Sequence, residues 1–196
     1  MNKPSLLLAT MVILLVALSG LDASFSFEKD FSADRIESDV LAFEDLVGTV
    51  EILHEKFRSL AVAMPEDAYL WGPMDGVRSV SEVYRHIAAD NFFVPTLMGI
   101  AAPPETGINE DASTFRAFQE RELNRDEVIE TVDASFEFLS RAMHATARDL
   151  NRQITLGTSE TTLGDVWIRA VVHLHEHLGQ SIAYARTNQV IPPWSN

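Results

Sequence analysis

The sequence predicts an all-α protein, a four-helix bundle whose helices are joined by long loops. Three observations predict it. Four segments carry apolar residues three or four positions apart, which is the spacing of one helix face. Capping residues stand before three of these segments, and prolines or polar stretches separate them. No segment shows a clear strand pattern, so helices packed on helices are expected.

The first two helices have clear boundaries. The first is expected over residues 33–64, because Pro65 disfavours helix in the residue before it. The second is expected over residues 79–100, where a Ser-x-x-Glu capping box provides acceptors and donors for its first turn. Pro95 falls inside this second helix and should kink it or shorten it. Residues 101–123 are mixed in character and predict a loop.

The third and fourth helices also begin at capping residues. The third is expected over residues 124–148, with Glu127 as the capping partner of Asn124. Residues 149–161 predict another loop. The fourth helix should cover residues 162–188 and begin at a Thr-x-x-Asp cap, and the Pro-Pro pair in the tail cannot continue it.

The N-terminus has the layout of a secretory signal peptide. Lys3 supplies a positive charge, residues 6–18 form an uncharged and mostly apolar run, and small residues follow. The run is shorter than the roughly 20 residues that span a bilayer. We therefore expect residues 1–23 to be a signal peptide, cleaved after Ser19 or Ala23. The alternative is an uncleaved segment that anchors the protein in the membrane.

Residues 24–33 are expected to be a leader, and residues 34–196 a single helical domain. The formal net charge is −14 and no Lys or Arg cluster is present, so we expect no nucleic-acid partner. The chain has no cysteine, which excludes disulfides, thiolate metal ligands and a cysteine nucleophile.

Histidines carry the densest chemistry. His173 and His177 are four residues apart on one predicted helix, so their imidazoles lie on the same face and could share one metal ion. His175 lies between them and should point away. A third ligand must come from another helix, and His86 is the better candidate. His54 is the rival, although a core histidine bonded to a backbone carbonyl or water is the simpler interpretation.

Other polar residues near these histidines have less specific patterns. Gln180 and Tyr184 continue the face of the histidine pair and could orient a ligand or simply pack between helices. Glu176 lies beside that face, where it would accept a hydrogen bond from an imidazole or remain solvated. His144 is expected to be a surface cation near a helix C-terminus.

Two stretches resemble a known family. One is GVRSVSEVYRHIA (residues 76–88), which contains a single histidine. The other is HLHEHLGQSIAYAR (residues 173–186), followed by VIPP (residues 190–193). With these motifs, residues 34–195 resemble the DinB-like family of small helical metalloproteins.

The resemblance implies that His86, His173 and His177 bind a divalent transition metal ion, with zinc expected first and nickel second. Well-understood family members are cytoplasmic enzymes that act with small thiol cofactors, among them thiol transferases and an isomerase. An exported protein would meet little of those thiols, which counts against thiol transfer here. Members often carry an arginine just before the Gly-Gln pair, where this chain has Leu178.

These observations predict an exported, metal-dependent enzyme of hydrolase or transferase type that acts on a small molecule. Three imidazoles leave coordination positions open, as in catalytic zinc sites. The alternatives are a non-catalytic metal-binding or interaction module of the cell envelope, and a bundle that has lost its metal. No stable membrane insertion is expected after signal cleavage. The sequence is also compatible with a homodimer.

Overall fold

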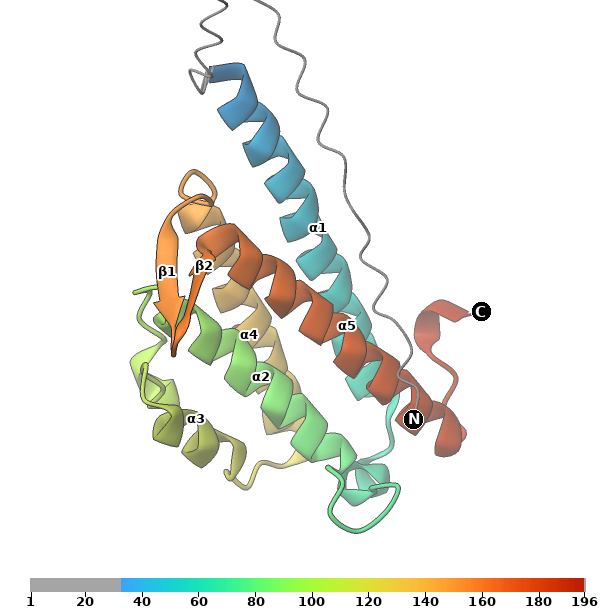
Figure 1. The fold of residues 1–196 in the computed structure, drawn as a ribbon. Coiled ribbons are helices and arrows are strands. Elements are labelled where there is room, and N and C mark those ends of the chain that lie inside the picture. The colour runs from blue at the N-terminus through green and yellow to red at the C-terminus, as the bar shows by residue number, and fades with distance from the viewer. Residues whose placement is uncertain (1–32, 196) are drawn as a thin grey trace, which may run out of the picture. The chain divides into compact units, whose positions relative to one another are not determined.

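The computed structural model describes residues 33–195, and four long helices form its main body (Figure 1). In this bundle α1 packs against α4, α4 against α2, α2 against α5, and α5 against α1, so the contacts close a ring. The predicted all-α fold is confirmed. The four helices are α1 (Ala33–Ala63), α2 (Val80–Thr96), α4 (Arg125–Thr146) and α5 (Leu163–Thr187).

The predicted signal peptide, residues 1–23, lies outside the described residues. So does the predicted leader, residues 24–33, apart from Ala33, the first residue of α1. Within residues 33–195, no helix combines the length and the apolar character needed to cross a membrane.

Local signals set the helix starts as expected. In each of three capping boxes, the first side chain accepts a hydrogen bond from the backbone N–H of the fourth residue, and the fourth side chain accepts one in return. The α2 helix ends at Thr96, four residues before the predicted end, because Pro95 has no N–H to donate and stops the helix within its last turn. The boxes are Ser79–Glu82, Asn124–Glu127 and Thr162–Asp165.

Two regions expected to be loops hold regular structure instead. The first contains α3 (Ala112–Gln119), which packs beside α2, outside the ring (Figure 1). The second contains an antiparallel hairpin of β1 (Gln153–Leu156) and β2 (Ser159–Thr162), whose turn uses Gly157 at a φ of 63°. The expectation of no strand was therefore wrong for this hairpin. Short 3₁₀ turns cover Glu66–Leu70, Pro104–Thr106 and Pro193–Ser195.

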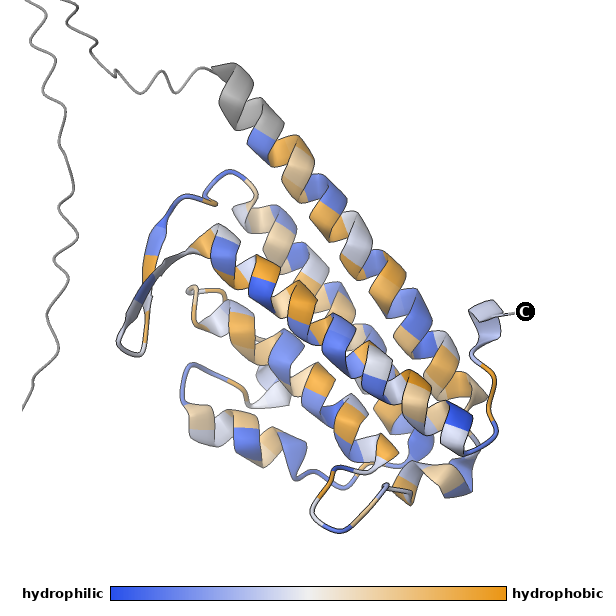
Figure 2. Ribbon diagram, turned by 45° about the vertical axis from the view of Figure 1, so that its right-hand side comes forward, coloured by the Kyte–Doolittle hydropathy of each residue, from blue (hydrophilic) through white to orange (hydrophobic). Residues whose placement is uncertain are grey.

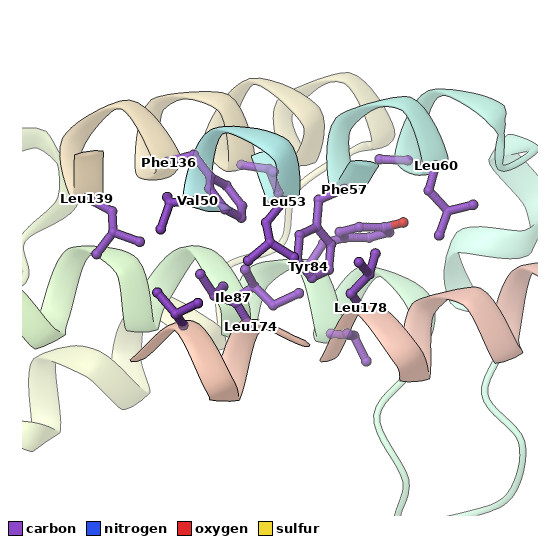
Figure 3. Packing of buried hydrophobic residues seen from close by; sticks show 14 of the residues in the cluster. Val50, Leu53, Phe57, Leu60, Tyr84, Ile87, Phe136, Leu139, Leu174 and Leu178 are labelled. Atoms are coloured by element: carbon purple, nitrogen blue, oxygen red, sulfur yellow. The ribbon is translucent and has the colours of Figure 1, made fainter. Parts of the chain in front are cut away.

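The hydrophobic core lies inside the four-helix ring. The helices carry hydrophobic and hydrophilic residues on different sides (Figure 2), and the buried ones point toward one another from all four helices (Figure 3). A second, smaller cluster joins α3 and the residues before it to α2 and α4. It consists of Ala88, Ala89, Phe92, Ile108, Phe118 and Phe138.

Phe57 tests how much the core contributes to stability. Its side chain is fully buried and its ring lies 5.6 Å from the ring of Phe136 and 6.4 Å from that of Tyr84. We expect Phe57→Ala to lower the free energy of unfolding by about 3–5 kcal/mol, because it leaves a cavity. Leu41→Ala, on the exposed side of α1, should change it by less than about 0.5 kcal/mol. Urea denaturation of both variants measures the free energy of unfolding. An equal loss of stability in the two variants would contradict the packing of Phe57 in the core.

Candidate metal centre

Two helices supply the four residues of the candidate metal centre. His86 and Asp90 stand one turn apart on α2, and His173 and His177 stand one turn apart on α5. Because α2 packs against α5, the two pairs meet where the helices touch. Among the described residues, these four form a group that could hold a metal ion. Each offers one ligand atom, and the four atoms lie within 4.8 Å of one another.

The three imidazoles direct the same atom, Nε2, toward a common point. Nε2 of His173 lies 3.1 Å from Nε2 of His177 and 3.0 Å from Oδ2 of Asp90. Nε2 of His86 lies 3.2 Å from the same carboxylate oxygen. Four donor atoms from two helices thus surround one small volume.

Two of the three imidazoles also have a hydrogen-bond acceptor for their other nitrogen. Nδ1–H of His86 donates to Oε1 of Gln119 over 2.9 Å, and Nδ1–H of His177 donates to Oε1 of Gln180 over 2.8 Å. Nδ1 of His173 lies 3.5 Å from Oε2 of Glu176. An acceptor at Nδ1 fixes the proton there and leaves the lone pair of Nε2 free, as in protein metal sites.

The acceptor of His177 belongs to a longer chain of hydrogen bonds. Nε2 of Gln180 donates to the hydroxyl of Tyr184 over 3.0 Å, and that hydroxyl donates to the backbone carbonyl of Arg78 over 3.1 Å. This chain ties the α5 side of the centre to the segment before α2. It therefore limits how far the His177 ring can turn.

Burial and charge act differently on the three histidines. Burial lowers the pKa of His86 and of His177, so both favour the neutral form that binds metal. The hydrogen bond to Asp90 raises the pKa of His173, whose side chain is 41 % exposed. A proton on His173 would thus be the one that a metal ion displaces.

The geometry fits a small divalent ion. In a tetrahedral zinc site with bonds of 2.0–2.1 Å, neighbouring donor atoms are about 3.3 Å apart. Three of the six separations between the four donor atoms, 3.0, 3.1 and 3.2 Å, are close to that value, and all six are within 4.8 Å. Imidazole nitrogens with a carboxylate oxygen suit zinc, nickel and related ions.

Comparisons with known proteins identify the family. The model of the DinB superfamily matches residues 49–181. The chain belongs to the DinB superfamily. A crystal structure of a DinB-like protein of Bacillus subtilis, YjoA, is similar in fold, with a TM-score of 0.56 and 18 % identity over 75 % of this chain and 94 % of that one. No curated protein sequence is significantly similar to the chain.

The structure of this DinB superfamily protein brings together the three histidines that the sequence predicts as ligands. That they bind a metal ion stays a prediction. His54 lies elsewhere, because its Nε2 bonds to Asp133 of α4 over 2.8 Å and its ring stacks on Phe136. The prediction that His54 bonds to a backbone carbonyl or water was wrong, because its partner is the carboxylate of Asp133.

Three other residues that the sequence singled out lie away from the centre. The side chain of His175 is exposed and bonds to a carbonyl of its own helix, that of Val171. His144 pairs with Glu44 on the surface over 3.4 Å. Leu178, where the family resemblance led us to expect arginine, is buried in the core.

Two residues of the centre were missed by the sequence analysis. Asp90 stands four residues after His86 on the same helix, so the spacing that identified the pair on α5 could also have found it. Gln119 gave no such signal, because it comes from α3, 33 residues away, and reaches His86 only through the fold.

The Nδ1 acceptors provide a test of the centre. We expect Gln180→Ala to weaken zinc affinity by about 10–100-fold, because the His177 ring loses the bond that orients it. Gln153→Ala, an exposed glutamine of β1, is the matched control and should bind zinc as the wild type does. Competition with a chromogenic chelator measures both. Equal affinity in the two variants would show that Gln180 does not support a zinc ligand.

Proposed function

We propose that this protein is an exported, metal-dependent enzyme of hydrolase or transferase type that holds zinc, or nickel in its place, through His86, His173 and His177. The observation that carries the proposal is the common direction of the three Nε2 atoms, two of which have a hydrogen-bond acceptor behind them on Nδ1. A polar network without a metal would not need all three rings turned the same way.

The surroundings of the centre support catalysis. The side chain of His86 is 10 % exposed and that of His173 is 41 % exposed, so the centre is closed on the α2 side and open on the α5 side. A divalent ion held there supplies Lewis-acid chemistry, which polarises a substrate oxygen or activates a water molecule. Asp90 is the carboxylate of the cluster, placed to accept and return a proton as a general base and acid.

A non-catalytic metal-binding module is the second candidate, and Asp90 is the observation that favours it. Its oxygen stands where a fourth ligand would complete a closed structural site. Cobalt-substituted protein separates the two functions, because the visible spectrum of cobalt reports its ligands. A spectral change on adding azide supports an open, catalytic site, and an unchanged spectrum supports a closed one.

Metal content tests both candidates. Purified protein should contain about one divalent ion per chain, and His173→Ala should lose it, because a central donor disappears. His175→Ala is the matched control, since this exposed histidine lies on the same helix and faces away from the centre. Elemental analysis of the three proteins is the measurement. No metal in the wild type, even after zinc is added, would overturn the metal function and favour a polar histidine network.

Export is proposed from the sequence of the first 23 residues. Protein expressed with its native N-terminus in a Gram-negative host should appear in the periplasmic fraction, with cleavage after Ser19 or Ala23 measured by intact mass. Changing two leucines of the apolar run to arginine should retain full-length protein in the cytoplasm. Full-length protein in the membrane fraction would support the anchored alternative instead.

A further inference from the structure

A cavity of about 510 Å³ lies next to the candidate metal centre. Its lining comes from the start of α2 and from α3, and it includes three arginines, Arg78, Arg85 and Arg116. The volume is within the range of small-molecule sites. Three of the 15 basic residues of a chain with a net charge of −14 thus gather around one cavity.

Within the described part of the chain, the three guanidinium groups have no carboxylate partner. Three glutamates line the same cavity, yet among residues 33–195 none of their oxygens lies within 4.0 Å of these arginines. The carboxylate of Glu82 instead accepts the backbone N–H of Ser79 over 2.7 Å, as part of the α2 cap. On the surface of such an acidic chain, arginines without a binding role would be expected to form ion pairs with these carboxylates.

Arg85 gives a second, independent observation. Its Nη1 donates to the backbone carbonyl of Arg121, which fixes the guanidinium at the edge of the cavity. Its buried Nε–H has no hydrogen-bond acceptor among the described residues. A buried donor without an acceptor is unfavourable, so an acceptor from outside the protein, a water molecule or an anion, is expected at this edge of the cavity.

The cavity and the metal centre share a residue. Gln119 lines the cavity and also accepts the Nδ1–H of His86, so one side chain separates the cavity from a predicted ligand. Nε2 of His86 points toward Asp90 of the centre and its Nδ1 toward Gln119, so the cavity lies behind His86 as seen from the centre.

We propose that this cavity binds a small anion that carries a carboxylate or a phosphate, on the side of His86 that faces away from the metal centre. Arginine is suited to this role because its planar donors match the oxygens of both groups and can bind them in pairs. This inference goes beyond the proposed metal-dependent function and does not depend on it. The anion site itself stands on the three arginines and the buried Nε–H of Arg85.

The test compares a double variant with a control of equal charge. Arg78→Gln/Arg116→Gln removes two exposed guanidiniums and leaves Arg85, which holds the Arg121 carbonyl. Arg148→Gln/Arg169→Gln removes two exposed arginines outside the cavity. Calorimetry measures the binding of succinate, inorganic phosphate and uncharged succinamide to each full-length protein, with and without zinc, and elemental analysis measures the zinc content.

We expect succinate or phosphate to bind the wild type and succinamide not to bind. The cavity variant should lose affinity at least tenfold, the control should stay within twofold, and zinc content should be the same in all. Loss for succinate alone identifies a carboxylate site, and loss for phosphate alone a phosphate site. Equal anion affinity in the two variants, or no anion binding to the wild type, overturns the proposal.

The zinc-free arm separates this inference from the proposed function. Arginine-dependent anion binding in protein that never takes up zinc would support the cavity and overturn the metal-dependent function. Normal zinc uptake together with anion binding that does not depend on the arginines would overturn the anion site and support the metal-dependent function.

Discussion

The packing of α2 against α5 is the contact on which the candidate metal centre depends. His86 directly precedes the core residue Ile87, and His173 directly precedes the core residue Leu174. Because a helix turns about 100° per residue, a neighbour of a core residue lies at the edge of the buried face. When two such faces pack, their edges meet. The same contact therefore buries the apolar residues and brings the imidazoles together.

Polar groups at such an edge must be paired, and here the pairing also sets their chemistry. The acceptors at Nδ1 of His86 and His177 turn their Nε2 atoms inward, and Asp90 faces Nε2 of His86 and of His173. Burial keeps His86 and His177 toward the neutral form by lowering the pKa of each, whereas the contact with Asp90 favours a proton on His173. Metal binding would require this proton to leave His173, because a metal ligand must offer a free lone pair.

The sequence was sufficient for features whose signals are local. The four long helices could be predicted because capping boxes, prolines and apolar spacing all lie within one segment. The α3 helix has only eight residues, too few to show an apolar stripe, and each hairpin strand has four. The pair on α5 could be found for the same local reason, and so could Asp90. Gln119 could not, because only tertiary packing places it at His86.

That packing makes α3 the element that joins the centre to the cavity. Phe118 is buried with Phe92 of α2, their rings 5.7 Å apart, so apolar contacts with α2 hold α3 in its position. From this position α3 contributes Gln119 to His86 and Arg116 to the cavity. A bundle of α1, α2, α4 and α5 alone would keep the histidines but lose an orienting acceptor and a guanidinium. The four-helix ring therefore carries all the candidate metal ligands, while the short helix outside it contributes to the proposed anion site.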